Sequence, residues 1–150
     1  MFELIRRIRI AGEHAAGTAE VAADDPALAD HFPGRPIVPG TWLVELAAQI
    51  AGPLAEDVTR ARHGLDRWAL LAMIEHAKLL VPVELPASLA LEATITRSDP
   101  SAATARVLAR CGERSVLRAD LVFALVEAPP GSERAIAARH DRLARWKAAP

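Results

Sequence analysis

Apolar and polar residues alternate along several stretches of the chain, a pattern with the two-residue period of β-strands. In 88–98, for example, Leu89, Leu91 and Ile95 fall on one face and Glu92 and Thr96 on the other. Short segments rich in glycine, proline or aspartate separate the alternating stretches and predict tight turns. We therefore expect an antiparallel meander. The predicted strands cover residues 2–12, 19–23, 67–81, 88–98, 102–111 and 115–126, with a turn over 13–18.

A different pattern covers residues 39–52, which are apolar on almost every side and predict a helix buried all round. Only Glu45 and Gln49 interrupt the apolar run. Pro53 predicts a kink or an end, with a second helical piece over 54–62, because an interior proline removes a helical hydrogen bond. One buried helix and an antiparallel sheet make an α+β domain.

Between these patterns lies a stiff segment that begins with His31. Residues 33–40 contain three prolines and two glycines, so they predict a shaped loop of low conformational entropy. A short helical turn over 26–29 is expected just before it. The loop ends at Pro39 and Gly40, where the helix begins. The chain thus places one histidine on a rigid loop that leads directly into a core helix.

The helix start carries residues suited to proton-transfer chemistry. Gln49 follows Glu45 by one helical turn, so the two side chains share a face and can form a hydrogen bond. The backbone N–H of Gly40 lies at the positive end of the helix dipole, where it can hold an oxygen that gains negative charge. A buried carboxylate needs a partner, so Glu45 either faces a cavity or bonds a neighbouring backbone amide. Trp42 either lines such a cavity or fills the core.

The residues His31-Phe-Pro-Gly-x-Pro-x-x-Pro-Gly40, followed by Glu45 and Gln49, resemble the active-site motif of the FabZ/FabA-type 3-hydroxyacyl-(acyl-carrier-protein) dehydratases. A weaker similarity continues over 73–86, and the resemblance spans roughly 23–126. Glu45 matches the acid of the FabZ-like branch, because the FabA-like branch has aspartate there. The resemblance implies the hotdog fold, in which an antiparallel sheet wraps around one long central helix.

The same resemblance implies roles for individual residues. His31 would act as the base and Glu45 as the acid, with Gln49 positioning Glu45. Gly40 would receive the thioester oxygen, and the adjoining Pro39 and Thr41 would belong to the substrate-binding surface.

The family also implies an assembly and a substrate. Its members place the histidine and the glutamate of one site on opposite protomers, so a homodimer, or an oligomer of dimers, is expected. The substrate would be an acyl chain on acyl carrier protein, held in an apolar tunnel at the interface, and no metal or cofactor is required.

Two other activities remain open at the level of sequence. One is a thioesterase of the same fold, in which water attacks the thioester. Thioesterases of this fold seldom combine His31 and Glu45 in this pattern. The other is a non-catalytic protein that binds acyl chains or the carrier.

Composition sets further bounds. The chain has 150 residues, a formal net charge of −1 and a single cysteine, Cys111. We expect one hotdog domain over 1–128, followed by a linker and helical tail over 129–150. The near-zero charge gives no reason to expect nucleic-acid binding. The absence of a long apolar run argues against a membrane span. A lone cysteine and a charged first segment favour the cytoplasm.

The tail predicts a helix that starts after Ser132 as N-cap. Ile136, Leu143 and Trp146 form a narrow apolar stripe along it. From Ser132 onward, the sequence contains five cationic residues and two acidic ones, an excess of three positive charges. The tail is therefore either a solvated helix docked on its own domain or its dimer partner, or a basic handle for an acidic carrier protein.

Overall fold

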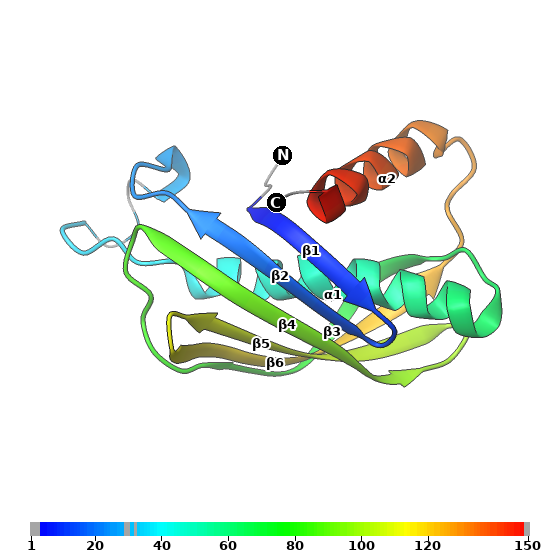
Figure 1. Ribbon diagram of the computed structural model, residues 1–150, viewed down its shortest axis with the longest axis horizontal. Coiled ribbons are helices and arrows are strands. Elements are labelled where there is room, and N and C mark those ends of the chain that lie inside the picture. The colour runs from blue at the N-terminus through cyan, green and yellow to red at the C-terminus, as the bar shows by residue number, and fades with distance from the viewer. Residues whose placement is uncertain (1–3, 29–30, 32, 149–150) are drawn as a thin grey trace.

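A computed structural model describes residues 4–28, 31 and 33–148. A curled antiparallel sheet wraps around one long helix, α1, and a second helix, α2, lies beside strand β1 (Figure 1). The expected α+β architecture is therefore confirmed. The elements are β1 (Ile5–Ala11), β2 (His14–Val21), the 3₁₀ turn η1 (Pro26–Leu28), α1 (Gly40–His63), β3 (Trp68–Leu79), β4 (Ala87–Ser98), β5 (Ala102–Cys111), β6 (Arg114–Val126) and α2 (Glu133–Ala148).

The sheet has the strand order β1-β2-β4-β5-β6-β3, so the expectation of a simple meander is wrong. Strand β3 does not lie between β2 and β4 but pairs with β6 at the far edge. The reason is α1, which lies between β2 and β3 in the sequence. The helix crosses the concave face of the sheet, so the chain reaches the opposite edge before β3 begins. The strands that follow one another without a helix, β4 to β6, do pair in sequence.

The first hairpin turns earlier than the glycine pattern suggested. Its turn lies at Gly12, whose φ of 59° favours glycine, and β2 already starts at His14. Gly17 therefore sits inside a strand, not in a turn. A Cβ on Gly17 would lie 2.7 Å from the carbonyl oxygen of Arg7 and 3.0 Å from Cδ1 of Ile50. The missing side chain lets β2 approach both β1 and α1.

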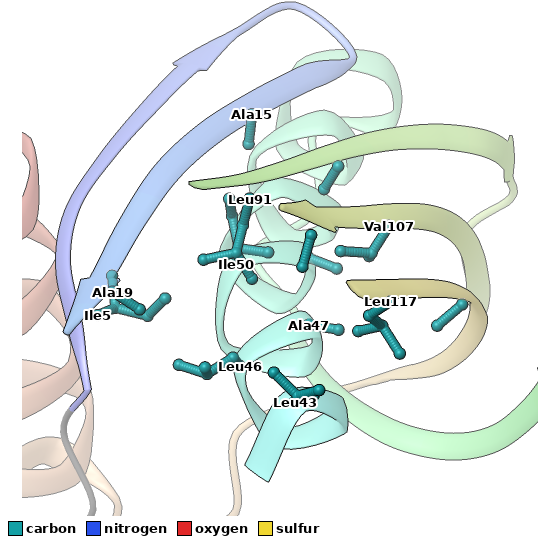
Figure 2. Close-up of a cluster of buried hydrophobic side chains, with 14 of the residues drawn as sticks. Ile5, Ala15, Ala19, Leu43, Leu46, Ala47, Ile50, Leu91, Val107 and Leu117 are labelled. Carbon is teal, nitrogen blue, oxygen red and sulfur yellow. The ribbon is translucent and has the colours of Figure 1, made fainter. Parts of the chain in front are cut away.

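Helix α1 is 24 residues long and includes Pro53 in its interior, so the predicted end at residue 52 is wrong. Buried side chains lie on both sides of the proline and anchor the helix against the sheet. Packing of this kind decides helix stability more than local propensity does. Figure 2 shows α1 side chains packed against residues of the sheet, among them Ile50 beside Leu91. Gly64 ends the helix in a left-handed conformation.

The helix is not buried all round in the single chain. Thr41 and Glu45 are exposed, and Val44 and Gln49 are only partly buried. One face of α1 is thus left uncovered by the sheet, and this face carries the polar residues singled out in the sequence.

Strand β3 and its continuation carry an unusual amount of exposed apolar surface. Six large hydrophobic side chains between residues 70 and 80 are 41–57% exposed, and β3 is an edge strand. They are Leu70, Leu71, Met73, Ile74, Leu79 and Leu80. Such an edge offers both unpaired backbone groups and an apolar surface to another chain.

The tail forms the predicted helix, α2. Its first hydrogen bond runs from the Ile136 N–H to the Ser132 carbonyl at 2.9 Å, so the helix starts directly after Ser132. Trp146 is buried in the core and Leu143 packs against it. Helix α2 is thus docked on its own domain. None of the described helices is long and apolar enough to cross a membrane.

Candidate active site

The His31 loop is held in place by backbone hydrogen bonds at both ends. The His31 N–H donates to the Leu28 carbonyl at 3.0 Å, which attaches the residue to the short η1 turn. Further along, the Val38 N–H donates to the Val83 carbonyl at 2.8 Å, and the Leu85 N–H donates to the Pro36 carbonyl at 3.2 Å. The segment before α1 is therefore tied to the strand-like residues 83–85. Phe32, within the motif, lies outside the described residues.

The loop delivers the chain to the N-terminus of α1. Pro39 is buried and has extended dihedral angles, and its carbonyl accepts the N–H groups of Trp42 and Leu43. The N–H groups of Gly40 and Thr41 precede these bonds and lie at the positive end of the helix dipole. This is the geometry expected of a group that receives a carbonyl oxygen.

Gly40 also lies against the end of the edge strand. A Cβ at this position would be 2.3 Å from Cδ1 of Leu79. Glycine is therefore needed for the close contact between the start of α1 and the last residue of β3. Trp42 packs against the hydrophobic core at this end of the helix.

Glu45 and Gln49 interact as their spacing predicts. The Gln49 side-chain Nε2 donates a hydrogen bond to Oε1 of Glu45 at 2.9 Å. This bond orients a carboxyl group that is itself exposed on the face of α1 not covered by the sheet. Glu45 therefore faces a cavity and is not a buried acid held by a backbone amide.

That cavity has a volume of about 400 Å³ and lies between α1, the sheet and α2. Glu45 and Gln49 are at one end of the α1 wall. Its apolar lining comes from all three elements: Ala48, Gly52, Pro53, Ala69, Leu71, Phe123, Leu143 and Trp146. A volume of this size lies at the lower end of the range for small-molecule sites.

A charged cluster occupies the other end of the cavity. Oε1 of Glu56 accepts a hydrogen bond from the Ala69 N–H at 2.9 Å and forms an ion pair with Arg139 of α2. The Arg139 guanidinium also lies 5.0 Å from the centre of the Trp68 ring. Burial, and secondarily the nearby positive charge of Arg142, lower the pKa of Arg139 from its ordinary value. The ion pair with Glu56 thus fixes α2 to α1.

Among the described residues of one chain, His31 and Glu45 line two different cavities. His31 is partly buried and lines a separate hollow of about 280 Å³, together with Asp24, Leu28 and Pro36. Gly40, Glu45 and Gln49 lie along the first turns of α1, and the latter two line the larger cavity.

The contribution of α2 to the larger cavity was missed at the level of sequence. The apolar stripe of the tail was visible, but nothing in its pattern indicated that Leu143 and Arg139 would face the helix carrying Glu45. His140 of α2 also lines this cavity. In the described ranges, no group of three or more histidine, cysteine, aspartate or glutamate side chains is arranged to hold a metal ion.

The sheet wrapped around α1 defines the class of protein. A Streptococcus mutans protein solved with acetyl CoA shares this fold, with a TM-score of 0.67 over 84% of this chain and 91% of that one. At 16% identity, this similarity concerns the fold alone. The chain has the hotdog fold, as expected.

Within that class, the family follows from sequence. The model of the FabA-like domain matches residues 1–120, and the chain belongs to this family. It is 30% identical to the 3-hydroxyacyl-(acyl-carrier-protein) dehydratase FabZ of Caldanaerobacter subterraneus subsp. tengcongensis. It is 31% identical to that of Clostridioides difficile strain 630. Both alignments cover 77% of this chain and 80% of the relative.

Proposed function

We propose that the protein dehydrates a 3-hydroxyacyl thioester carried on acyl carrier protein, giving the trans-2-enoyl thioester. Such a reaction serves fatty-acid, polyene or polyketide-type biosynthesis in the cytoplasm. The observation that carries the proposal is the Glu45–Gln49 pair, which faces a cavity just beyond the Gly40 helix start. The relatives named FabZ support the same reaction.

Each proposed residue has one step in the reaction. His31 removes the proton from C2, and the electron pair of that C–H bond forms the C2–C3 double bond. The C3–O bond breaks, and Glu45, or a water it orients, supplies the proton with which the hydroxyl leaves as water. Backbone N–H donors at Gly40 hold the thioester oxygen while it carries negative charge. The proton on His31 must then return to Glu45 for the next turnover.

The reaction needs His31 and Glu45 at one substrate, and a second copy of the chain supplies the missing half. Edge strand β3, with its exposed apolar side chains, fits pairing with β3 of another copy across a two-fold axis. Leu79 touches Gly40, so this edge reaches the start of α1. In the proposed homodimer, His31 of one protomer completes the site around Glu45 of its partner.

The activity is tested by incubating the protein with a 3-hydroxyacyl thioester of pantetheine or carrier protein. Enoyl absorbance and free thiol are followed together. Enoyl formation without thiol supports the dehydratase, thiol release identifies a thioesterase, and neither signal indicates a binding protein. His31→Ala should reduce enoyl formation by about 10²–10⁴-fold, the contribution of a general base. Undiminished turnover by a folded variant would contradict the role of His31.

The two-protomer site is tested by mixing two inactive variants, His31→Ala and Glu45→Gln, under conditions that exchange subunits. A mixed dimer has one intact site, so the equal mixture should recover about a quarter of the wild-type activity. If both residues act within one chain, mixing restores nothing.

A further inference from the structure

Helix α2 stands apart from the part of the chain that defines the family. The family model ends at residue 120, whereas α2 covers Glu133–Ala148. Yet α2 is not a free tail, since Trp146 is buried and Arg139 pairs with Glu56 of α1. The family match therefore leaves unassigned a helix that is built into the molecule beside the proposed catalytic acid.

The larger cavity follows α1 away from Glu45. Ala48, Gly52 and Pro53 line it along successive turns of the helix, and Leu143 of α2 also lines it. These side chains are small or apolar and offer nothing for the reaction itself. A hydrocarbon chain that starts at a carbon held near Glu45 is the chemical group that such a lining accommodates.

The cavity ends at charged groups. The Glu56–Arg139 pair has side chains only 16% and 34% exposed, and Arg139 is further held by the Trp68 ring. Beyond it, Arg60 pairs with Asp66 at 2.8 Å and lies 3.7 Å from Asp57. An alkyl chain that entered this cluster would have to separate or desolvate paired charges, which is unfavourable.

We propose that α2 forms the distal wall of the acyl-binding cavity, and that Leu143 and the Glu56–Arg139 pair set the longest acyl chain the protein accepts. This inference rests on the proposed function, because it names the part of the substrate that lies beyond the reacting carbons. The occupant is the acyl chain itself.

The helix gives a scale for this limit. Glu56 follows Glu45 by three turns, which places it about 16 Å further along the helix axis. An extended chain advances about 1.2 Å per bond, so about a dozen carbons span this distance. Substrates of short and medium chain length are therefore expected, and long-chain substrates should be excluded.

The test compares Leu143→Trp and Leu143→Ala with the wild-type protein across 3-hydroxyacyl pantetheine thioesters from butyryl to palmitoyl length. Leu143→Trp narrows the cavity, so kcat/KM for the longest accepted substrate should fall at least about tenfold while the butyryl substrate changes less than about twofold. Leu143→Ala should move the limit to longer chains. Ala144→Trp adds the same bulk on the exposed side of α2 and should leave the profile unchanged.

A second measurement keeps this inference separate from the proposed reaction. Calorimetric binding of S-alkyl pantetheine thioethers, which cannot react, should show the same chain-length limit and the same shift in Leu143→Trp. If the wild type binds these probes but forms no enoyl product, the dehydratase proposal fails and the cavity assignment stands. The assignment is overturned if Leu143→Trp has the wild-type profile, if Ala144→Trp changes the profile equally, or if no thioether binds. A longer limit in Leu143→Trp would also overturn it, because it would mean that the helix had been displaced.

Discussion

Individual side chains in this protein are positioned by very short stretches of sequence. The one-turn spacing of Glu45 and Gln49 is sufficient to form their hydrogen bond, and Pro39–Gly40 is sufficient to start the helix beside it. These local features were predictable because they depend on helix geometry and on proline and glycine stereochemistry. The opposite held for Leu143 and Arg139, whose position beside Glu45 depends on how a distant segment docks.

Substitution of Gln49 by leucine tests the positioning of Glu45. Glu45 must carry a proton to act as the acid, and a hydrogen bond between neutral groups contributes about 0.5–1.5 kcal/mol, so kcat should fall by about two- to tenfold. KM should change little, since Gln49 acts on the acid and not on the acyl chain. Steady-state kinetics with a 3-hydroxyacyl thioester provide the measurement. Gln49→Glu, which cannot donate the bond when ionised, should lose a similar factor, and full activity in both variants would rule out the assigned role.

At the level of elements, the alternation in β4, β5 and β6 gave strands within a residue or two of those observed. Glycine and proline were the main sources of error. The pattern places Gly17 in a turn and predicts a kink or an end at Pro53, whereas Gly17 lies inside β2 and Pro53 inside one continuous helix. Both residues weaken their element locally, and tertiary contacts to buried neighbours override that preference. Such contacts join residues far apart in the chain, so the local pattern contains no sign of them.

Gly17→Ala should destabilise the protein by about 1–3 kcal/mol, because the added methyl group has no room beside the Arg7 carbonyl and Ile50. The urea midpoint of unfolding should fall while the slope of the transition stays constant. The exposed neighbour Ala16 provides the control, since Ala16→Ser should change the stability by less than about 0.5 kcal/mol. Equal stability of the two variants would show that β2 can move away from α1 at no cost.

Pro53→Ala tests whether packing carries α1 through the proline. A proline in a helix interior costs about 3 kcal/mol, because it lacks the backbone N–H and its ring clashes with the preceding turn. Alanine removes both penalties, but it also raises the entropy of the unfolded chain, which offsets part of the gain. The free energy of unfolding should therefore rise by about 1–2 kcal/mol, as measured by urea denaturation. A loss of stability would mean that the Pro53 ring contributes more by packing than the helix loses.

For the molecule as a whole, the sheet order could not be derived from the order of strands along the chain. The family resemblance supplied the hotdog fold, whereas the local pattern supplied only strands and turns, which suggested a meander. The placement of β3 at an edge depends on α1 crossing the sheet. That placement leaves the apolar side chains of β3 exposed, and the proposed dimer accounts for them.

Ile74→Lys places a charge in the middle of this edge and should convert the dimer to a folded monomer, because an edge lysine opposes strand pairing. Sedimentation velocity measures the change in mass, and enoyl formation should be lost with it. Ala90→Lys, an exposed substitution in the interior strand β4, should leave both mass and activity unchanged. A monomeric Ile74→Lys protein with full turnover would contradict a site shared between protomers.

The contact between Gly40 and the tip of Leu79 has a practical consequence for the enzyme at low concentration. If two copies join along β3, that leucine would be pressed onto the helix start. Subunit association would then be coupled to the conformation of the Gly40 amide, which we propose holds the thioester oxygen. Specific activity should then decline on dilution, with a lag on reconcentration that reflects the rate at which subunits meet.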